Sequence, residues 1–519
     1  MPTLAPCSGT GNEMPTAEMA GTNEVAGTKV IEAAADLDAA VIREVSAGLR
    51  IQLGRGLESR LQARCELARA ALRSGAEAYG VTTGMGSLSS VELSAAEQRA
   101  HQRNLLLGRA TGGPPWLPAA DVRAIIAVRL RTFLSGDAAV SADLCRRLTD
   151  VLAAGLTPAV PQGGAGSAGE IIQLSHCFGP LVGIGAVLGP PGPGGQPASP
   201  TAAAAALAEH GLPAFELGPK EGIALLAGVP GATALSILAG AEAARVATMM
   251  TAAAGLSIAA IRAPADPYLS ACARGDDILG AVLGRIRAII EPAGPPRMLQ
   301  APVSFRVTGP VLAQVERAAQ ALAAATGRAL TGVTDSPAFL DGRFVSTAGF
   351  HGIDLAAQCD QLTVAITHAA EVAAARIHRL LDSRVTGLPA QLADRPGPQA
   401  GLVTVHKRAV GEVHALRRLA LPTSVGLIET SGGQEDVQSF AWEAALNLRS
   451  ALSRARAVVA AEALTAFRAA SLAGRTLPGG SQALLDRLSA IIRPIDGDRQ
   501  FGADIELLLD GSWSCQPDG

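Results

Sequence analysis

The sequence predicts an all-α fold, and two observations indicate it. Apolar residues recur at helical spacing from 354 to 381 and from 435 to 471, and neither stretch contains a Pro or Gly. Ala, Leu and Gly dominate the composition, whereas the strand-favouring aromatic residues make up only 3%. These features are typical of long helices that pack closely side by side in a bundle.

A shorter amphipathic helix is expected from Asp121 to Phe133. Asp121 is expected to cap its first turn and Gly136 to end it. The residues that share its apolar face are Val122, Ile125, Ile126, Leu130 and Phe133. Further along, the Pro- and Gly-rich stretch 189–200 predicts a surface loop, and 201–210 predicts a short Ala-rich helix.

Composition and charge narrow the class of protein. The 519 residues include 43 basic and 46 acidic side chains, so the formal charge is 43 − 46 = −3, which argues against a nucleic-acid partner. The seven cysteines show no CxxC spacing, and no secretory signal precedes the helices, so we expect a cytoplasmic protein without structural zinc or disulfides. The uncharged stretches 222–241 and 171–188 contain Gly, Pro or polar residues and are expected to be core helices rather than membrane spans.

Common enzyme motifs are weak or missing. The segment 164–169, GAGSAG, matches the dinucleotide pattern GxGxxG, but the residues before it form a poor strand and no acidic residue follows at the required distance. The eight histidines have no metal-ligand spacing, so no metal site is expected. The chain has only two tyrosines, Tyr79 and Tyr268, and each lies in a break between helices.

Eight segments, in order, resemble motifs of the histidine and phenylalanine ammonia-lyase family, also called the aromatic amino acid lyases. They are YGVTTGMG at 79–86, 101–110, 160–176, PKEGIALLAG at 219–228, VTDSP at 333–337, GFHG at 349–352, RIHRLLD at 376–382 and TSGGQED at 430–436. The resemblance covers about residues 35–470. It implies a homotetramer with a long parallel helix bundle, a small-molecule substrate, and active sites assembled from more than one subunit.

The resemblance fails at the residues that build the family's cofactor. Members of the family form an electrophilic methylidene-imidazolone by cyclising Ala-Ser-Gly, and the middle Ser loses its hydroxyl. This sequence reads Ser167-Ala168-Gly169 instead, one residue shorter after Pro161. Because the Cβ of Ala168 carries no leaving group, the sequence predicts that this cofactor is absent.

Two further departures concern the contacts to cofactor and substrate. The family's Asn in LLNG is Ala227 here, and the Arg of its YSLRC motif is matched to Ala271. Loss of that Arg removes the guanidinium that would bind a substrate carboxylate through two hydrogen bonds. Arg274 or Arg109 could hold a differently placed anion, or could form plain surface ion pairs.

Other residues of the predicted site are kept. The positions that match family residues are Tyr79, Tyr268, Phe350 and Glu435, and His351 follows Phe350. We expect Tyr79 to act as the base, because neighbouring positive charge can stabilise a phenolate. Tyr268 would donate a proton, and Phe350 and His351 would contact the substrate. Glu435 would be either a relay or amine partner, or a helix cap.

The sequence therefore predicts a cofactor-independent lyase or cyclase that acts on a substrate with its own conjugated or carbonyl activation, in specialised metabolism. Two alternatives remain: a conventional ammonia-lyase or aminomutase, and a non-catalytic binding or scaffold protein. The expected regions are a flexible tail (1–28), an N-terminal active-site region (29–230), a central helix bundle (231–475) and a C-terminal segment (476–519).

Overall fold

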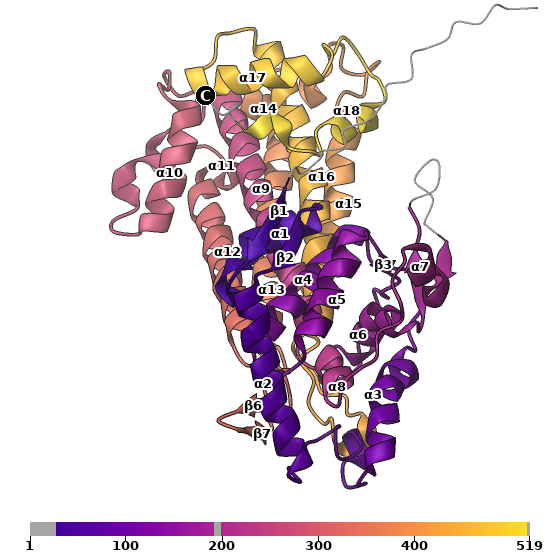
Figure 1. Ribbon diagram of the computed structural model, residues 1–519. Helices are drawn as coiled ribbons and strands as arrows, with labels where there is room; N and C mark the ends of the chain where they lie inside the picture. The colour runs from indigo at the N-terminus through magenta and orange to yellow at the C-terminus, as the bar shows by residue number, and fades with distance from the viewer. Residues whose placement is uncertain (1–26, 191–198, 516–519) are drawn as a thin grey trace, which may run out of the picture.

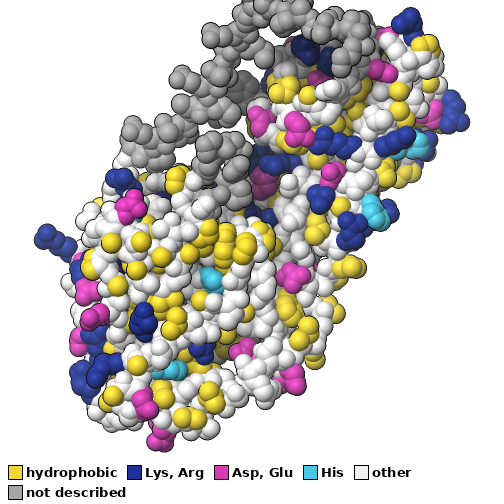
Figure 2. Space-filling view, turned by 90° about the vertical axis from the view of Figure 1, so that its right-hand side faces the viewer, with side chains coloured by type: hydrophobic (Ala, Val, Ile, Leu, Met, Phe, Trp, Pro, Cys, Tyr) yellow, Lys and Arg dark blue, Asp and Glu magenta, His cyan; other side chains and the backbone are white. Residues whose placement is uncertain are grey.

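Long helices that run side by side form the body of the molecule (Figure 1). This computed structural model describes residues 27–190 and 199–515. Helices make up 61% of it and strands 6%, so the predicted all-α class is confirmed. Basic and acidic side chains are interspersed on the face shown in Figure 2, in keeping with the near-neutral net charge.

The helices are α1 (Ala39–Ser46), α2 (Arg55–Arg73), α3 (Ala95–Arg109), α4 (Ala119–Leu134), α5 (Ala142–Ala153), α6 (Ile171–Phe178), α7 (Ala203–Glu209), α8 (Glu221–Leu226), α9 (Pro230–Ile261), α10 (Asp277–Ile290), α11 (Val303–Arg306), α12 (Thr308–Thr331), α13 (Ile353–Leu380), α14 (Ser383–Thr386), α15 (Val403–Leu419), α16 (Ala441–Ala473), α17 (Gly479–Ile491) and α18 (Phe501–Leu507). The strands are β1 (Thr28–Ile31), β2 (Arg50–Leu53), β3 (Thr157–Pro158), β4 (Ala186–Leu188), β5 (Pro200–Ala202), β6 (Ala338–Leu340) and β7 (Arg343–Val345). β1 and β2 pair in parallel, and the pairs β3–β4, β4–β5 and β6–β7 are antiparallel.

The bundle is built from α9, α12, α13, α15 and α16, and α9 packs along both α16 and α12. Small residues make this packing close, because Ala, Gly and Ser fill most positions of α9. At Gly255, a Cβ would lie 2.6 Å from a side-chain carbon of Ile289 in α10, so only glycine fits there. The packing of α9 against its neighbouring helices therefore depends on residue size as much as on hydrophobicity.

The apolar stretch that is long enough to span a membrane is mostly buried inside the protein. The stretch Glu221–Ile261, which comprises α8, α9 and the three residues between them, is the one stretch of the described chain long and apolar enough to cross a membrane. Within its most apolar window, 89% of the residues are buried inside the protein, as in the core helix of a soluble protein.

Several predicted boundaries need correction. The helix expected at 121–133 is α4, but Pro118 rather than Asp121 occupies its N-cap, and Ser135 ends it before Gly136. Asp121 lies buried in the first turn and pairs with Arg449 of α16. The long helix expected from 435 is α16, which begins six residues later, at Ala441.

The predicted tail and loop lie mostly outside the described residues. Residues 1–26 and 191–198 are not described, whereas Thr28 already belongs to β1 and Pro200 to β5. The short helix expected at 201–210 is α7, which begins two residues later, at Ala203, because Thr201 and Ala202 belong to β5.

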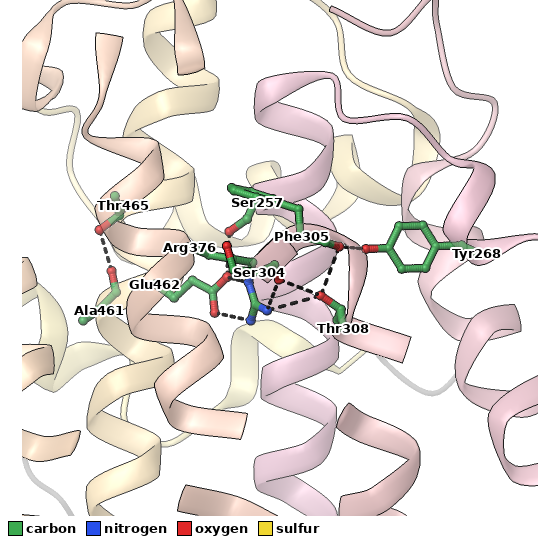
Figure 3. A network of polar contacts seen from close by, with 9 residues as sticks. All are labelled: Ser257, Tyr268, Ser304, Phe305, Thr308, Arg376, Ala461, Glu462 and Thr465. Atoms are coloured by element: carbon green, nitrogen blue, oxygen red, sulfur yellow. Dashed lines mark hydrogen bonds and ion pairs between the residues drawn. The ribbon is translucent and has the colours of Figure 1, made fainter. Parts of the chain in front are cut away.

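A buried polar network joins the bundle helices at the end where α11 lies (Figure 3). Arg376 of α13 and Glu462 of α16 form a bidentate ion pair with N–O distances of 2.5 and 2.8 Å, and both side chains are at most 3% exposed. Glu462 also accepts a hydrogen bond from Ser257 of α9. Buried charges of this kind are tolerated only when each has its partner.

We expect Arg376→Met to lower the free energy of unfolding by about 3–5 kcal/mol, because it leaves the Glu462 carboxylate buried without a counter-charge. The measurement is urea-induced unfolding. Arg328→Met is the matched control: its ion pair with Asp354 is exposed (60% and 45%) and should contribute less than about 1 kcal/mol. Equal losses in the two variants would contradict a special role for the buried pair.

Candidate functional site

A cavity of about 310 Å³ lies where the N-terminal helices meet the ends of the bundle helices near β6 and β7. Most of its wall is apolar or backbone, and Tyr79 and Glu435 contribute its phenol and its carboxylate. The lining residues are Tyr79, Met85, Ala168, Gly169, Ile171, Ile223, Leu226, Ala227, Gly228, Ser336, Ser346, Thr347, Phe350, Gln434 and Glu435. The structure thus brings together residues separated by more than 350 positions in the chain.

The segment that contains Ala168 is fixed to the bundle by the residues that flank it. The carboxylate of Glu170 is 1% exposed and accepts hydrogen bonds from the first-turn N–H groups of Gly231 (2.7 Å) and Ala232 (2.6 Å) in α9. On the other side, the indole N–H of Trp442 donates to the carbonyl of Gln162 at 2.7 Å. Both α9 and α16 therefore position the turn that forms one wall of the cavity.

Two residues of the tripeptide Ser167-Ala168-Gly169, Ala168 and Gly169, line the cavity, and the side chain of Ala168 is a methyl group. The Ser167 hydroxyl is buried and donates to the carbonyl of Gly169 at 2.8 Å. A Cβ on Gly169 would lie 3.4 Å from the carbonyl oxygen of Gly228, so the turn approaches the backbone after α8 closely.

Glu435 reaches the cavity from the loop before α16, residues 422–438, which we call the Glu435 loop. Its carboxylate accepts a hydrogen bond from the backbone N–H of Ala168 at 2.8 Å. The hypothesis that Glu435 caps a helix is wrong, because α16 begins at Ala441 with Phe440 as its N-cap. Glu435 instead ties its loop to the Ala168 turn.

Asp360 of α13 anchors the start of the Glu435 loop. Its carboxylate accepts four hydrogen bonds, from the backbone N–H and the hydroxyl of both Thr423 and Ser424, at 2.7–3.2 Å. Between this anchor and Glu435, the loop exposes Val425, Leu427 and Ile428. The position of Glu435 therefore depends on Asp360 as well as on Ala168.

Tyr79 presents its phenol oxygen to the cavity in a polar setting. The oxygen accepts a hydrogen bond from the backbone N–H of Gly86 at 2.7 Å. Arg109 of α3 lies near Tyr79 and Glu435: burial lowers the pKa of its guanidinium, whereas these two groups raise it. One Nη of Arg109 lies 3.8 Å from the sulfur of Met85, at the cavity edge.

Of the other residues predicted to lie in the site, some line the cavity and others do not. Phe350 and Ala227 line the cavity, as expected. His351 does not line it: its ring Nε2 is buried and has no hydrogen-bond partner among the described residues, and its carbonyl accepts from the Ser439 hydroxyl.

Tyr268, Ala271 and Arg274 do not line the cavity. Tyr268 is 1% exposed, and its hydroxyl donates to the carbonyl of Phe305 in α11, far along the bundle from the cavity (Figures 1 and 3). Burial raises the pKa of Tyr268 to about 12. The Tyr268 hydroxyl is therefore enclosed by its own chain and does not line the cavity. Ala271 and Arg274 follow it in an exposed segment.

Sequence reasoning missed several wall residues, among them Ser336 and Thr347 from the segments that flank β6 and β7. Ser336 lies in the VTDSP segment, but that motif alone gave it no role, and Thr347 lies in none of the eight segments. No group of three or more His, Cys, Asp or Glu side chains that could hold a metal ion occurs in the parts of the chain that the structure describes.

Comparison with known proteins identifies the family. The sequence profile of the aromatic amino acid lyases matches residues 37–512. The chain belongs to the aromatic amino acid lyase family. It is 33% identical over 484 residues to a histidine ammonia-lyase of Streptomyces coelicolor (90% of this chain, 92% of the relative) and 32% identical over 481 residues to one of Symbiobacterium thermophilum (89% and 92%).

Solved structures share the fold. Tyrosine aminomutase of Streptomyces globisporus superposes with a TM-score of 0.86 at 26% identity (93% of this chain, 97% of that chain). The ergothioneine-degrading enzyme ergothionase of Treponema denticola also has a TM-score of 0.86, at 22% identity (93% and 98%). These matches agree with the predicted ammonia-lyase fold.

The buried position of Tyr268 draws attention to a second placement of the family's YSLRC motif. The segment 303–307, VSFRV, keeps two of the five letters, as does YLSAC at 268–272. In this placement Arg306 matches the motif's Arg and Val303 its Tyr. Arg306 has a buried Nε without a hydrogen-bond partner among the described residues, whereas Arg274 is exposed. The buried Nε of Arg306 is an N–H donor without a hydrogen-bond partner among the described residues, and it favours this second placement. Motif comparison alone did not reveal it.

We expect Asp360→Ala to release the Glu435 loop, because four hydrogen bonds to one carboxylate are lost. Backbone amides from 423 to 438 should then exchange hydrogen at least about tenfold faster, since tenfold corresponds to about 1.4 kcal/mol of lost protection. Glu44→Ala, at an exposed carboxylate of α1, is the control. Unchanged exchange in Asp360→Ala would show that other contacts hold the loop.

Proposed function

We propose that this chain is an enzyme of the lyase or cyclase type that works without the methylidene-imidazolone cofactor of its family. The observation that carries the proposal is Ala168: a methyl group stands in the cavity wall where the family's electrophile arises from a Ser. The neighbouring Ser167 cannot replace it, because Ala168 would then stand where ring closure requires a glycine.

The retained polar groups support catalysis rather than loss of function. Tyr79 and Glu435 line one cavity, and Arg109, whose pKa is lowered by burial, lies near both of them. Several titratable side chains gathered at a cleft are a common mark of an active site. In the proposed mechanism, Tyr79 is the base, with the Gly86 N–H and the Arg109 charge stabilising its phenolate. Phe350 packs against the substrate.

The substrate must supply its own activation, since the proposed site has no electrophile. An alkene conjugated with a carbonyl meets this need. Tyr79 removes a proton from an O–H, N–H or C–H of the substrate, and the freed electron pair forms a bond to the β-carbon. The alkene electrons move toward the carbonyl oxygen to give an enolate. Protonation of the α-carbon completes an intramolecular cyclisation, and the reverse sequence is a β-elimination.

Arg109 is the proposed partner for the enolate oxygen or another substrate anion. It lies near Tyr79 and Glu435, whereas Ala271 and Arg274 are outside the cavity. In this scheme Tyr268 is not the proton donor, because its hydroxyl already donates to the carbonyl of Phe305. Tyr79 instead returns to the substrate the proton that it removed.

The proposed setting is a cytoplasmic homotetramer in specialised metabolism with a small-molecule substrate. Ala-rich helices support assembly, and self-activated substrates are more typical of specialised pathways than of amino-acid catabolism. The names of the curated relatives favour a second candidate, a conventional ammonia-lyase or aminomutase. A non-catalytic binding role is the third, and the convergence of Tyr79 and Glu435 argues against it.

The proposal is tested by comparing metabolite masses in the native host carrying wild type or Tyr79→Phe at matched levels of soluble protein. Loss of a positioned acid or base should reduce turnover about 10²–10⁴-fold, so one precursor should accumulate and one product disappear. Equal masses for the pair indicate a cyclase, and a product lighter by a small fragment indicates a lyase. Identical profiles in the two strains would favour the scaffold role and contradict the proposal.

A further inference from the structure

A second cavity of about 440 Å³ lies at the opposite end of α9 from the site described above, between the C-terminal end of α9 and the start of α17. We call it the arginine pocket. Arg262 and Arg475 line it, together with Thr476, Gly479 and the wall formed by Pro292–Pro295. No Asp or Glu side chain is among its lining residues.

The positive charge of the arginine pocket is not neutralised within the chain. Arg297 lies beside the two lining arginines, since its backbone N–H donates to the carbonyl of Arg262 at 3.0 Å. No ion pair links any of the three to a carboxylate within 4.0 Å, over residues 27–190 and 199–515. Burial lowers the pKa of Arg475, and the charges of Arg262 and Arg297 lower it further, as expected for clustered cations.

Two of the three arginines are held in place by hydrogen bonds to backbone carbonyls. Arg475 donates to the carbonyls of Ala259 and Ala260, both at 2.9 Å, and so satisfies the C-terminal end of α9. Arg297 donates to the carbonyl of Thr386 at 2.7 Å. The guanidinium of Arg262 makes no hydrogen bond to the described residues, and its backbone is in the left-handed region, with φ 53°.

The start of α17 adds to the positive character. Gly479 is the first residue of this 13-residue helix and lines the pocket, and no side chain caps the helix there. First-turn N–H groups without a capping side chain favour an anion. The charge of Arg475 offsets the negative C-terminal end of the α9 dipole, so the electrostatic potential in the pocket is positive.

We propose that the arginine pocket binds the phosphate group of a small phosphate monoester. A guanidinium fork matches phosphate oxygens, and a dianion offsets two neighbouring arginines better than a single carboxylate does. The volume of about 440 Å³ leaves room for an organic group beside the phosphate, against the Pro292–Pro295 wall. This site is separate from the Tyr79 cavity, and its ligand is not the substrate of the proposed reaction.

The test is isothermal titration calorimetry of the full chain at low salt with inorganic phosphate and with glycerol 3-phosphate. We expect one site per chain, tighter binding of the ester because the wall contacts its carbon skeleton, and weaker binding as salt increases. Arg262→Gln should weaken the binding of both ligands at least about tenfold, because a charge-assisted contact to the phosphate is lost.

Arg43→Gln is the matched control, because Arg43 is an exposed arginine of α1 outside the pocket. It removes the same charge and should leave both affinities unchanged. The proposal is overturned if neither ligand binds, if the ester binds no more tightly than inorganic phosphate, or if Arg262→Gln and Arg43→Gln behave alike.

Discussion

The buried carboxylate of Glu170 is the contact on which the rest of the site depends. It accepts two hydrogen bonds from the first turn of α9, and a Cβ at Gly231 would lie 2.7 Å from one of its oxygens and 2.2 Å from the Trp442 ring. The N-terminus of the longest apolar helix, the start of α16 and the Ala168 turn are thereby packed against one another. Once that junction is fixed, the Ala168 N–H can meet Glu435.

A divergent active site can keep such a junction while it loses its cofactor. Glu170 and Gly231 serve the stability of α9, so they are required whether or not an electrophile is made. Ala168 and Ala227, in contrast, touch the cavity and are free to change with the chemistry. The proposed loss of the methylidene-imidazolone therefore leaves the scaffold intact and changes what kind of substrate it can activate.

Much of the fold was predictable because it follows from local pattern. Uninterrupted helical spacing predicted α13 and α16, and the ordered motifs predicted the bundle and placed Tyr79, Ala168, Phe350 and Glu435, which meet in one cavity. Contacts between distant segments were not predictable in the same way. Asp360 as the anchor of the Glu435 loop, and Tyr268 enclosed against Phe305, depend on packing that no spacing encodes. The start of α16 was misplaced because residues 435–440 are as free of Pro and Gly as the helix itself.

A chain that forms no electrophile from residues 167–169 keeps the mass of its unmodified sequence. Mass spectrometry of the intact purified protein, with fragment masses over this tripeptide, measures this directly. We expect a mass equal to that of the unmodified sequence. A mass lower by two waters, with the deficit located in the fragment that contains Ala168, would contradict it and restore the conventional ammonia-lyase or aminomutase chemistry of the family.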